Sequence, residues 1–295
     1  MQESICVHPR PEPEGLAQRY KAYYYRIMQL RIIDDDFMRK VFEDRDCTQL
    51  VLRIIMEKPD LKVEEVRVQQ DMKNLQGRSL ELDVFAVDSA GKRYNIEIQR
   101  DGQGAGRKRA RYHSSLLDAN TLEAGKDFKN LPESYVIFIT ESDVIGKGLP
   151  VYHVDRIIRE TGESFDDGCH IIYVNSGIQD DTELGKLMHD FWCRDAKDMN
   201  YDVLADRVRY FKETEKGVKD MCEIMEEIRQ EGIEFGLEQG LEQGLEQGLQ
   251  CGTEQGIYKI NMLGKHLMNE GRLEDFVRSM SDCVYQKQLL EEFGI

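Results

Sequence analysis

Hydrophobic and polar residues alternate along residues 80–86 and again along residues 94–99, on either side of a short loop. Alternation with a period of two is typical of β-strands, and Gly91 in the loop can take the positive φ that a tight turn requires. We therefore predict an antiparallel hairpin whose polar face brings two carboxylates together. The residues of interest on that face are Asp83, Glu97 and Gln99.

Helical and extended patterns continue on both sides of the hairpin. Asp34 is a candidate N-cap, and Pro59 breaks the helix that it begins. The run at 134–140 is almost wholly apolar and β-branched, which predicts a central buried strand. The predicted elements are helices at 14–33 and 35–57, a strand at 65–70, the hairpin, a helix at 107–123, strands at 134–140, 151–158 and 169–175, and helices at 181–193, 201–211 and 215–230. The predicted buried stripe of the second helix is Phe37, Met38, Val41 and Phe42.

Glycine then recurs at every fourth residue from Gly232 to Gly256, within a repeated Leu-Glu-Gln-Gly unit. On a helix these glycines drift by about 40° per step, so they form a slowly winding stripe that allows close contact with another helix. Each glycine costs up to ~1 kcal/mol relative to alanine. The segment is therefore either a helix stabilised by a partner or disordered. Residues 257–295 are predicted to form two short amphipathic helices that turn near Gly271.

Composition limits the class of protein. Residues 1–15 are polar with three prolines and do not resemble a signal peptide, and no apolar run approaches the ~18 residues that a membrane span needs. Seven cysteines without a C-x-x-C pair indicate reduced thiols and a cytoplasmic location. We interpret the Cys169–His170 and His189–Cys193 pairs as structural, because such residues usually pack in the core.

Charge is unevenly distributed along the chain, whose net charge is −16. Residues 92–112 hold seven basic and two acidic side chains, whereas residues 213–250 hold eleven acidic and three basic ones. The positive cluster therefore follows the proposed carboxylates directly. It is either a phosphate-binding surface or a solvated helix face, and the two interpretations remain open.

Two carboxylates held side by side repel each other, and a hard divalent cation relieves that repulsion. Such a cation can activate water and stabilise charge on a phosphoryl group. The alternative is that the acidic side chains form the solvated face of an ordinary hairpin. Asp35 also has two interpretations: it is either an outer acid of a metal site or an ordinary acidic residue at a helix N-terminus.

The spacing of Asp83 and Glu97-Ile98-Gln99 resembles the PD-(D/E)XK nuclease signature in its E-x-Q form. More narrowly, residues 32–230 resemble the PD-(D/E)XK nuclease family transposases, or Rpn-type recombination-promoting nucleases. Further matches are D-x-x-M-x-x-x-F from Asp35 and R-x-x-Y at Arg109 and Tyr112. The resemblance implies an α/β, restriction-endonuclease-like α-β-β-β-α-β core with a helical C-terminal extension. It divides the chain into a leader and helix at 1–31, a nuclease-like domain at 32–230, the repeat at 231–256 and a helical tail at 257–295.

The resemblance also implies the roles of the site residues. Asp83, Glu97 and the backbone of Ile98 would hold Mg²⁺ or Mn²⁺, with Asp35 as a further acid. Gln99 stands where lysine is usual, so it can orient a water or a phosphate but supplies no charge. The expected phosphate-binding side chains are Arg109, Tyr112, Arg107 and Lys108. For Arg109 the alternative is a structural ion pair with Asp83 or Glu97.

The resulting hypothesis is a metal-dependent DNA endonuclease that hydrolyses phosphodiester bonds, as a transposase or recombination-promoting nuclease of a mobile element. Cutting two strands needs two sites, so a homodimer formed through the glycine repeat is expected. Two alternatives stay open: a catalytically degenerate DNA-binding module, and a self-assembly scaffold in which the tail matters most.

Overall fold

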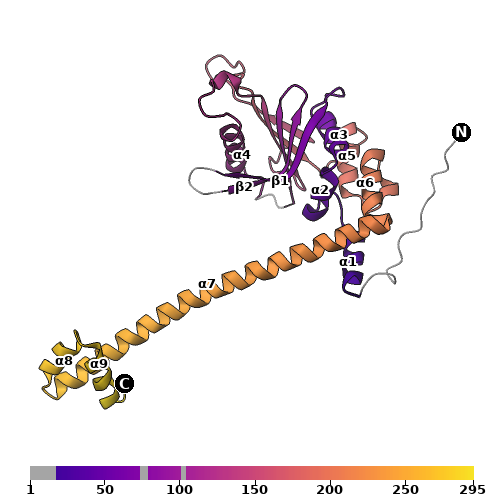
Figure 1. Ribbon diagram of the computed structural model, residues 1–295. Helices are drawn as coiled ribbons and strands as arrows, with labels where there is room; N and C mark the ends of the chain where they lie inside the picture. The colour runs from indigo at the N-terminus through magenta and orange to yellow at the C-terminus, as the bar shows by residue number, and fades with distance from the viewer. Residues whose placement is uncertain (1–17, 74–78, 101–103) are drawn as a thin grey trace. The chain divides into compact units, whose positions relative to one another are not determined.

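The computed structural model describes residues 18–73, 79–100 and 104–295 (Figure 1). Residues 1–17, which include most of the predicted leader, and residues 74–78 and 101–103 lie outside this description. The chain divides into two compact units that meet between Glu223 and Ile224. Among the described residues, no helix is both long enough and apolar enough to cross a membrane.

The first unit is built on a mixed six-stranded sheet with the strand order β1-β2-β3-β4-β6-β5. Strands β1, β2 and β3 form an antiparallel meander, β3, β4 and β6 run parallel, and β5 pairs antiparallel with β6 at the edge. The strands are β1 (Val63–Lys73), β2 (Ser79–Asp88), β3 (Arg93–Gln99), β4 (Ser134–Thr140), β5 (Val151–Val154) and β6 (Cys169–Asn175). Because β3 lies between β2 and β4, it is a central strand.

Helices cover both faces of this sheet (Figure 1). On one face, α4 (Arg107–Ala119) packs through Ala110 against a cluster that includes Val136 and Phe138 of β4. The other helices of the first unit carry their own apolar faces, and the ring pairs Phe42–Phe191 and Phe37–Phe211 join three of them at centroid distances of 5.9 and 6.0 Å. These helices are α1 (Gln18–Gln29), α2 (Asp35–Phe42), α3 (Arg45–Ile55), α5 (Glu183–Trp192) and α6 (Asp202–Glu213).

The order of elements confirms the predicted α-β-β-β-α-β core with a helical C-terminal extension. The predicted strands at 134–140 and 169–175 and the buried stripe of α2 agree with the structure residue by residue. The single helix predicted at 35–57 is wrong. It is two helices, because Asp44 accepts hydrogen bonds from the backbone N–H groups of Asp46 and Cys47 and begins a new helix, α3.

Other boundaries differ in smaller ways. Asp34 occupies the N-cap position of α2, but its carboxylate accepts from the Arg31 backbone N–H at 2.8 Å and from the Arg31 guanidinium at 3.0 Å, and it caps no N–H of α2. The strand predicted at 151–158 ends at Val154, and beyond it the chain continues in irregular structure with one isolated bridge. Strand β1 is longer than predicted at both ends.

The glycine repeat of the second unit is helical, within α7 (Glu215–Asn269). Four repeat leucines expose 74–76% of their surface, and a Cβ added at any glycine from Gly232 to Gly256 would meet no atom within 4 Å. Because α7 continues to Asn269, it includes the first of the two tail helices predicted from residue 257. The end of α7 packs through Leu263 and Leu267 against α8 (Leu273–Ser279) and α9 (Cys283–Glu292), after a turn at Gly271 with φ +72°.

Candidate functional site

Asp83 and Glu97 lie at the end of the β2–β3 ladder. The paired register runs from Val87 opposite Arg93 to Val84 opposite Ile96, one residue before the two acids. Beyond this paired register, hydrogen bonds from backbone N–H groups to side chains link the two strands. The Ile98 N–H donates to Asp83 Oδ2 at 3.0 Å, and the Asp83 N–H donates to Glu97 Oε1 at 3.4 Å. The structure therefore brings both carboxylates to one point on the sheet.

The two acids are buried to different extents, Asp83 partly and Glu97 completely. Glu97 is fully buried, and its Oε2 has no hydrogen-bond partner among the described residues. Burial, followed by the nearby charge of Glu97, raises the pKa of Asp83 to about 7, although the Ile98 N–H opposes this shift. Two acids that resist ionising together are typical of a site that accepts a cation.

Helix α2 adds a third acid and a cation. Asp35, the first residue of α2, is near enough for its charge to raise the pKa of Asp83 further, and Arg39 lowers it. Desolvation raises the pKa of Asp35 itself, and Arg39 again opposes the shift. Arg39 also lies 3.8 Å from Glu81, and its Nε is buried without a hydrogen-bond partner among the described residues. Sequence analysis missed Arg39, although its place one turn after Asp35 was a usable signal.

Helix α4 covers the same face of β3. Its Arg109 is half-exposed and reaches inward, so that Nη2 lies 3.8 Å from Glu97 Oε2. One turn later, the fully buried His113 contacts Arg109, Glu97 and Asn95. Sequence analysis gave His113 no role, although its place one turn after Arg109 was a usable signal.

The other predicted site residues are more dispersed. Gln99 is the last residue of β3 and is partly exposed, in register with Thr140 of β4. Arg107 and Lys108 are exposed on the first turn of α4. Tyr112 packs against a hydrophobic cluster of β1, β2 and α4, which includes Met72, Leu82, Phe85, Leu116 and Leu117. The structure therefore places Tyr112 in a packing position.

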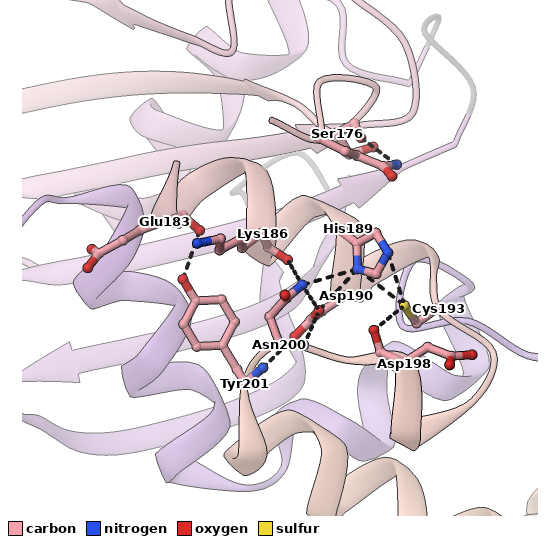
Figure 2. A network of polar contacts seen from close by, with 10 residues as sticks. Ser176, Glu183, Lys186, His189, Asp190, Cys193, Asp198, Asn200 and Tyr201 are labelled. Carbon is pink, nitrogen blue, oxygen red and sulfur yellow. Dashed lines mark hydrogen bonds and ion pairs between the residues drawn. The ribbon is translucent and has the colours of Figure 1, made fainter. Parts of the chain in front are cut away.

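A second group of potential ligands lies on α5 and is shown in Figure 2. One donor atom from each of His189, Asp190 and Cys193 lies within 4.8 Å of the others. The fully buried Asp190 accepts hydrogen bonds from Asn200 N at 2.7 Å, Asn200 Nδ2 at 2.9 Å and Tyr201 N at 2.9 Å. These bonds connect α5 to the start of α6.

The same group fits a metal ion poorly. Burial and the charge of Asp190 raise the pKa of the Cys193 thiol to about 11, whereas a metal needs the thiolate. The Asp190 oxygens already accept three N–H groups. This arrangement agrees with the structural role predicted for His189 and Cys193.

The Asp83–Glu97 pair fits a metal better. Its donors are carboxylate oxygens, which suit hard cations such as Mg²⁺ and Mn²⁺. One of them, Glu97 Oε2, is a buried acceptor that lies 3.8 Å from Nη2 of the Arg109 guanidinium and has no hydrogen-bond partner among the described residues. An uncompensated carboxylate oxygen in a buried position is costly, and a bound cation would remove that cost.

An α-β-β-β-α-β core with paired acids on its second and third strands defines the class of PD-(D/E)XK nucleases. Within that class, the chain belongs to the PD-(D/E)XK nuclease family transposases, whose family model matches residues 36–231. Neither the curated proteins nor the solved structures gave a significant match to this chain. Nucleases of this class generally use divalent metals, and membership of the family supports a nuclease- or transposase-like function and suggests DNA binding.

Proposed function

We propose that this protein is a metal-dependent endonuclease that hydrolyses phosphodiester bonds in DNA, as part of transposition or recombination. The observation that carries the proposal is the pairing of a partly buried Asp83 with a fully buried Glu97, whose Oε2 has no hydrogen-bond partner among the described residues. A strained acid pair of this kind has no evident purpose in a sheet that only supports packing.

Asp83, Glu97 and the backbone carbonyl of Ile98 would hold Mg²⁺ or Mn²⁺. The cation would supply Lewis-acid activation of water and of the phosphate. Gln99 would orient the attacking water through its amide, because it can donate and accept hydrogen bonds but cannot carry charge. The Arg109 guanidinium would neutralise the phosphate.

Further side chains would serve substrate binding rather than chemistry. Arg107 and Lys108, both exposed at the start of α4, would contact the DNA backbone. Asp35 would act as an outer acid through water. Tyr112 would support α4 from the hydrophobic cluster against which it packs. A cytoplasmic location agrees with this proposal, because all described cysteines are free thiols.

Plasmid nicking tests the proposal. We expect wild type to convert supercoiled plasmid with Mg²⁺ or Mn²⁺, and to lose this activity in EDTA. Asp83→Ala and Glu97→Ala should each reduce nicking to background. Asp71→Ala is the matched control, because Asp71 is an exposed acid on the neighbouring strand β1. Equal nicking by wild type and Asp83→Ala would remove Asp83 from the mechanism.

A homodimer formed through the repeat of α7 is also part of the proposal. Exposed leucines next to glycines with open space above them suit close packing against a second, identical helix. Light scattering on the full chain should give a dimer mass, and Leu241→Glu with Leu245→Glu should give a monomer mass. A monomer mass for wild type would contradict this interpretation.

The second candidate function is DNA binding without cleavage, and Gln99 is the observation that favours it. A site without the usual lysine lacks a cation beside the attacking water. Titration calorimetry separates the two functions. Absence of Mn²⁺ binding together with salt-sensitive DNA binding would favour the degenerate module.

A further inference from the structure

The side of Glu97 that faces α4 is occupied by a histidine. The ring of His113 and the carboxylate of Glu97 are both fully buried, and His113 Nδ1 lies 3.5 Å from Glu97 Oε1. The other ring nitrogen, Nε2, accepts a hydrogen bond from Arg109 Nε at 3.2 Å. The ring edge packs against Phe138 at a centroid distance of 5.6 Å. His113 is therefore held rigidly between an acid and a cation of the candidate site.

The hydrogen-bond chemistry sets the tautomer of this ring. A guanidinium can only donate, so Nε2 must be the unprotonated nitrogen, and a neutral imidazole then carries its hydrogen on Nδ1. That hydrogen points between Glu97 Oε1, which lies 3.5 Å from Nδ1, and the Asn95 amide group, whose Nδ2 position lies 3.0 Å from Nδ1. A half-turn of the Asn95 amide places its oxygen there as an acceptor. The ring thus donates on one side and accepts on the other.

This arrangement separates the two oxygens of Glu97. Oε1 faces the Asp83 N–H and His113, whereas Oε2 has no hydrogen-bond partner among the described residues. Arg109 is fixed through its Nε on His113, which leaves its terminal nitrogens near Oε2 but not bonded to it. An arginine without this anchor would be free to form a bidentate pair with the acid and close the site.

We propose that His113 is a positioning residue that turns Glu97 Oε2 towards the metal position and holds the Arg109 guanidinium beside it for the phosphate. The inference rests on the proposed function, because it assigns to His113 the orientation of two groups of that site. Partners that orient a metal ligand typically change metal affinity by about 10-fold to 100-fold when they are removed.

Mn²⁺ affinity, measured by titration calorimetry without DNA, tests the first half of the proposal. His113→Phe keeps a ring but removes both hydrogen bonds, and we expect it to bind Mn²⁺ about 10-fold to 100-fold more weakly than wild type. His113→Gln can donate and accept, and should stay within about 3-fold of wild type. Ser114→Ala is the matched control, because Ser114 is buried next to His113 and its Oγ has no hydrogen-bond partner among the described residues.

DNA affinity in EDTA tests the second half and does not depend on a core substitution. Arg109→Lys alters a half-exposed side chain and keeps its charge, but it loses the Nε–H that binds His113. We expect this variant to bind a short fluorescent duplex several-fold more weakly than wild type. Affinity equal to wild type would overturn the positioning of Arg109, even if His113→Phe fails to fold.

The outcomes separate the inference from the function on which it rests. Absence of Mn²⁺ binding by wild type refutes the proposed function. Mn²⁺ binding by wild type and by a folded His113→Phe with equal affinity refutes the role of His113 alone. A loss of affinity in both His113→Phe and His113→Gln, or in Ser114→Ala, would show that the packing of α4 matters and not the hydrogen bonds of the ring.

Discussion

Asp83→Asn should stabilise the metal-free protein and abolish its response to metal. The substitution removes one of two neighbouring negative charges and changes the shape of the side chain very little. Asparagine keeps an oxygen that can accept the Ile98 N–H, the hydrogen bond that Asp83 makes at 3.0 Å. The main change is therefore the loss of repulsion with Glu97 and of the cost of burying a charge.

The magnitude follows from the pKa of Asp83, which burial and Glu97 raise from 3.8 to about 7. This difference corresponds to about 4 kcal/mol when the group is ionised, and because the cost is shared with Glu97 we expect a gain of about 1–3 kcal/mol. A raised pKa means that the folded protein binds this proton more tightly than the unfolded chain. The contribution of Asp83 to the stability of wild type should therefore be highest below about pH 4, decrease as the pH rises to about 7, and then level off.

Urea denaturation in EDTA across this pH range measures the effect. At about pH 8, Asp83→Asn should unfold at a higher urea concentration than wild type, with an unchanged dependence of the unfolding free energy on urea. The advantage of Asp83→Asn over wild type in unfolding free energy should grow as the pH rises from about 4 to about 7. Saturating Mn²⁺ should then raise the stability of wild type by about 3 kcal/mol at 100 times its dissociation constant. The ion should leave Asp83→Asn unchanged.

Cys193→Ser is the control for the second ligand group, and it should respond to Mn²⁺ like wild type. Two results would refute the reasoning. An Asp83→Asn variant that is less stable than wild type at about pH 8 would show that the acid pair is not strained. Equal stabilisation of Asp83→Asn by Mn²⁺ would show that the ion binds elsewhere.

Three further substitutions test the packing of the first unit and the repeat. Lys212→Met should lower the free energy of unfolding, measured by urea denaturation, by about 2–5 kcal/mol. The reason is that the buried Lys212 ammonium donates to the carbonyls of Leu30 and Arg194 at 2.5 and 2.6 Å. A loss below about 1 kcal/mol would contradict this role. Gly217→Ala should cost at least about 1–3 kcal/mol, because the added Cβ would lie 2.1 Å from a backbone oxygen. Gly240→Ala, measured in the monomeric Leu241→Glu, Leu245→Glu background, meets open space and should stabilise the same helix by up to ~1 kcal/mol. Equal effects at both positions would refute the difference.

The parts of the fold that could be predicted are those with strong local signals. The run at 134–140 is apolar at almost every position because β4 is buried on both faces, and its predicted bounds agree with the structure. The break between α2 and α3 was missed because Asp44 lies within a continuous helical pattern. Its cap is visible only once its carboxylate is seen to accept two backbone N–H groups.

The site itself was predicted only in part. Spacing on two strands was enough to bring Asp83 and Glu97 together, because a hairpin pairs residues that are near in sequence. The contribution of α4 could not be read in the same way. Its register over β3, and with it the contact between His113 and Glu97, depends on tertiary packing that no local pattern encodes.

The alternation along β3 has a different meaning in the structure from the one that the sequence suggested. A half-exposed hairpin would leave its polar face in water, where Asn95 and Glu97 would cost nothing. Instead β3 is central and α4 covers that face, so that both side chains are fully buried. Burying an acid and an amide in a central strand costs several kcal/mol unless they find partners. The fold keeps this cost, because Glu97 Oε2 has no hydrogen-bond partner among the described residues. For this reason we interpret the polar side chains of β3 as part of a binding site and not as a solvated surface.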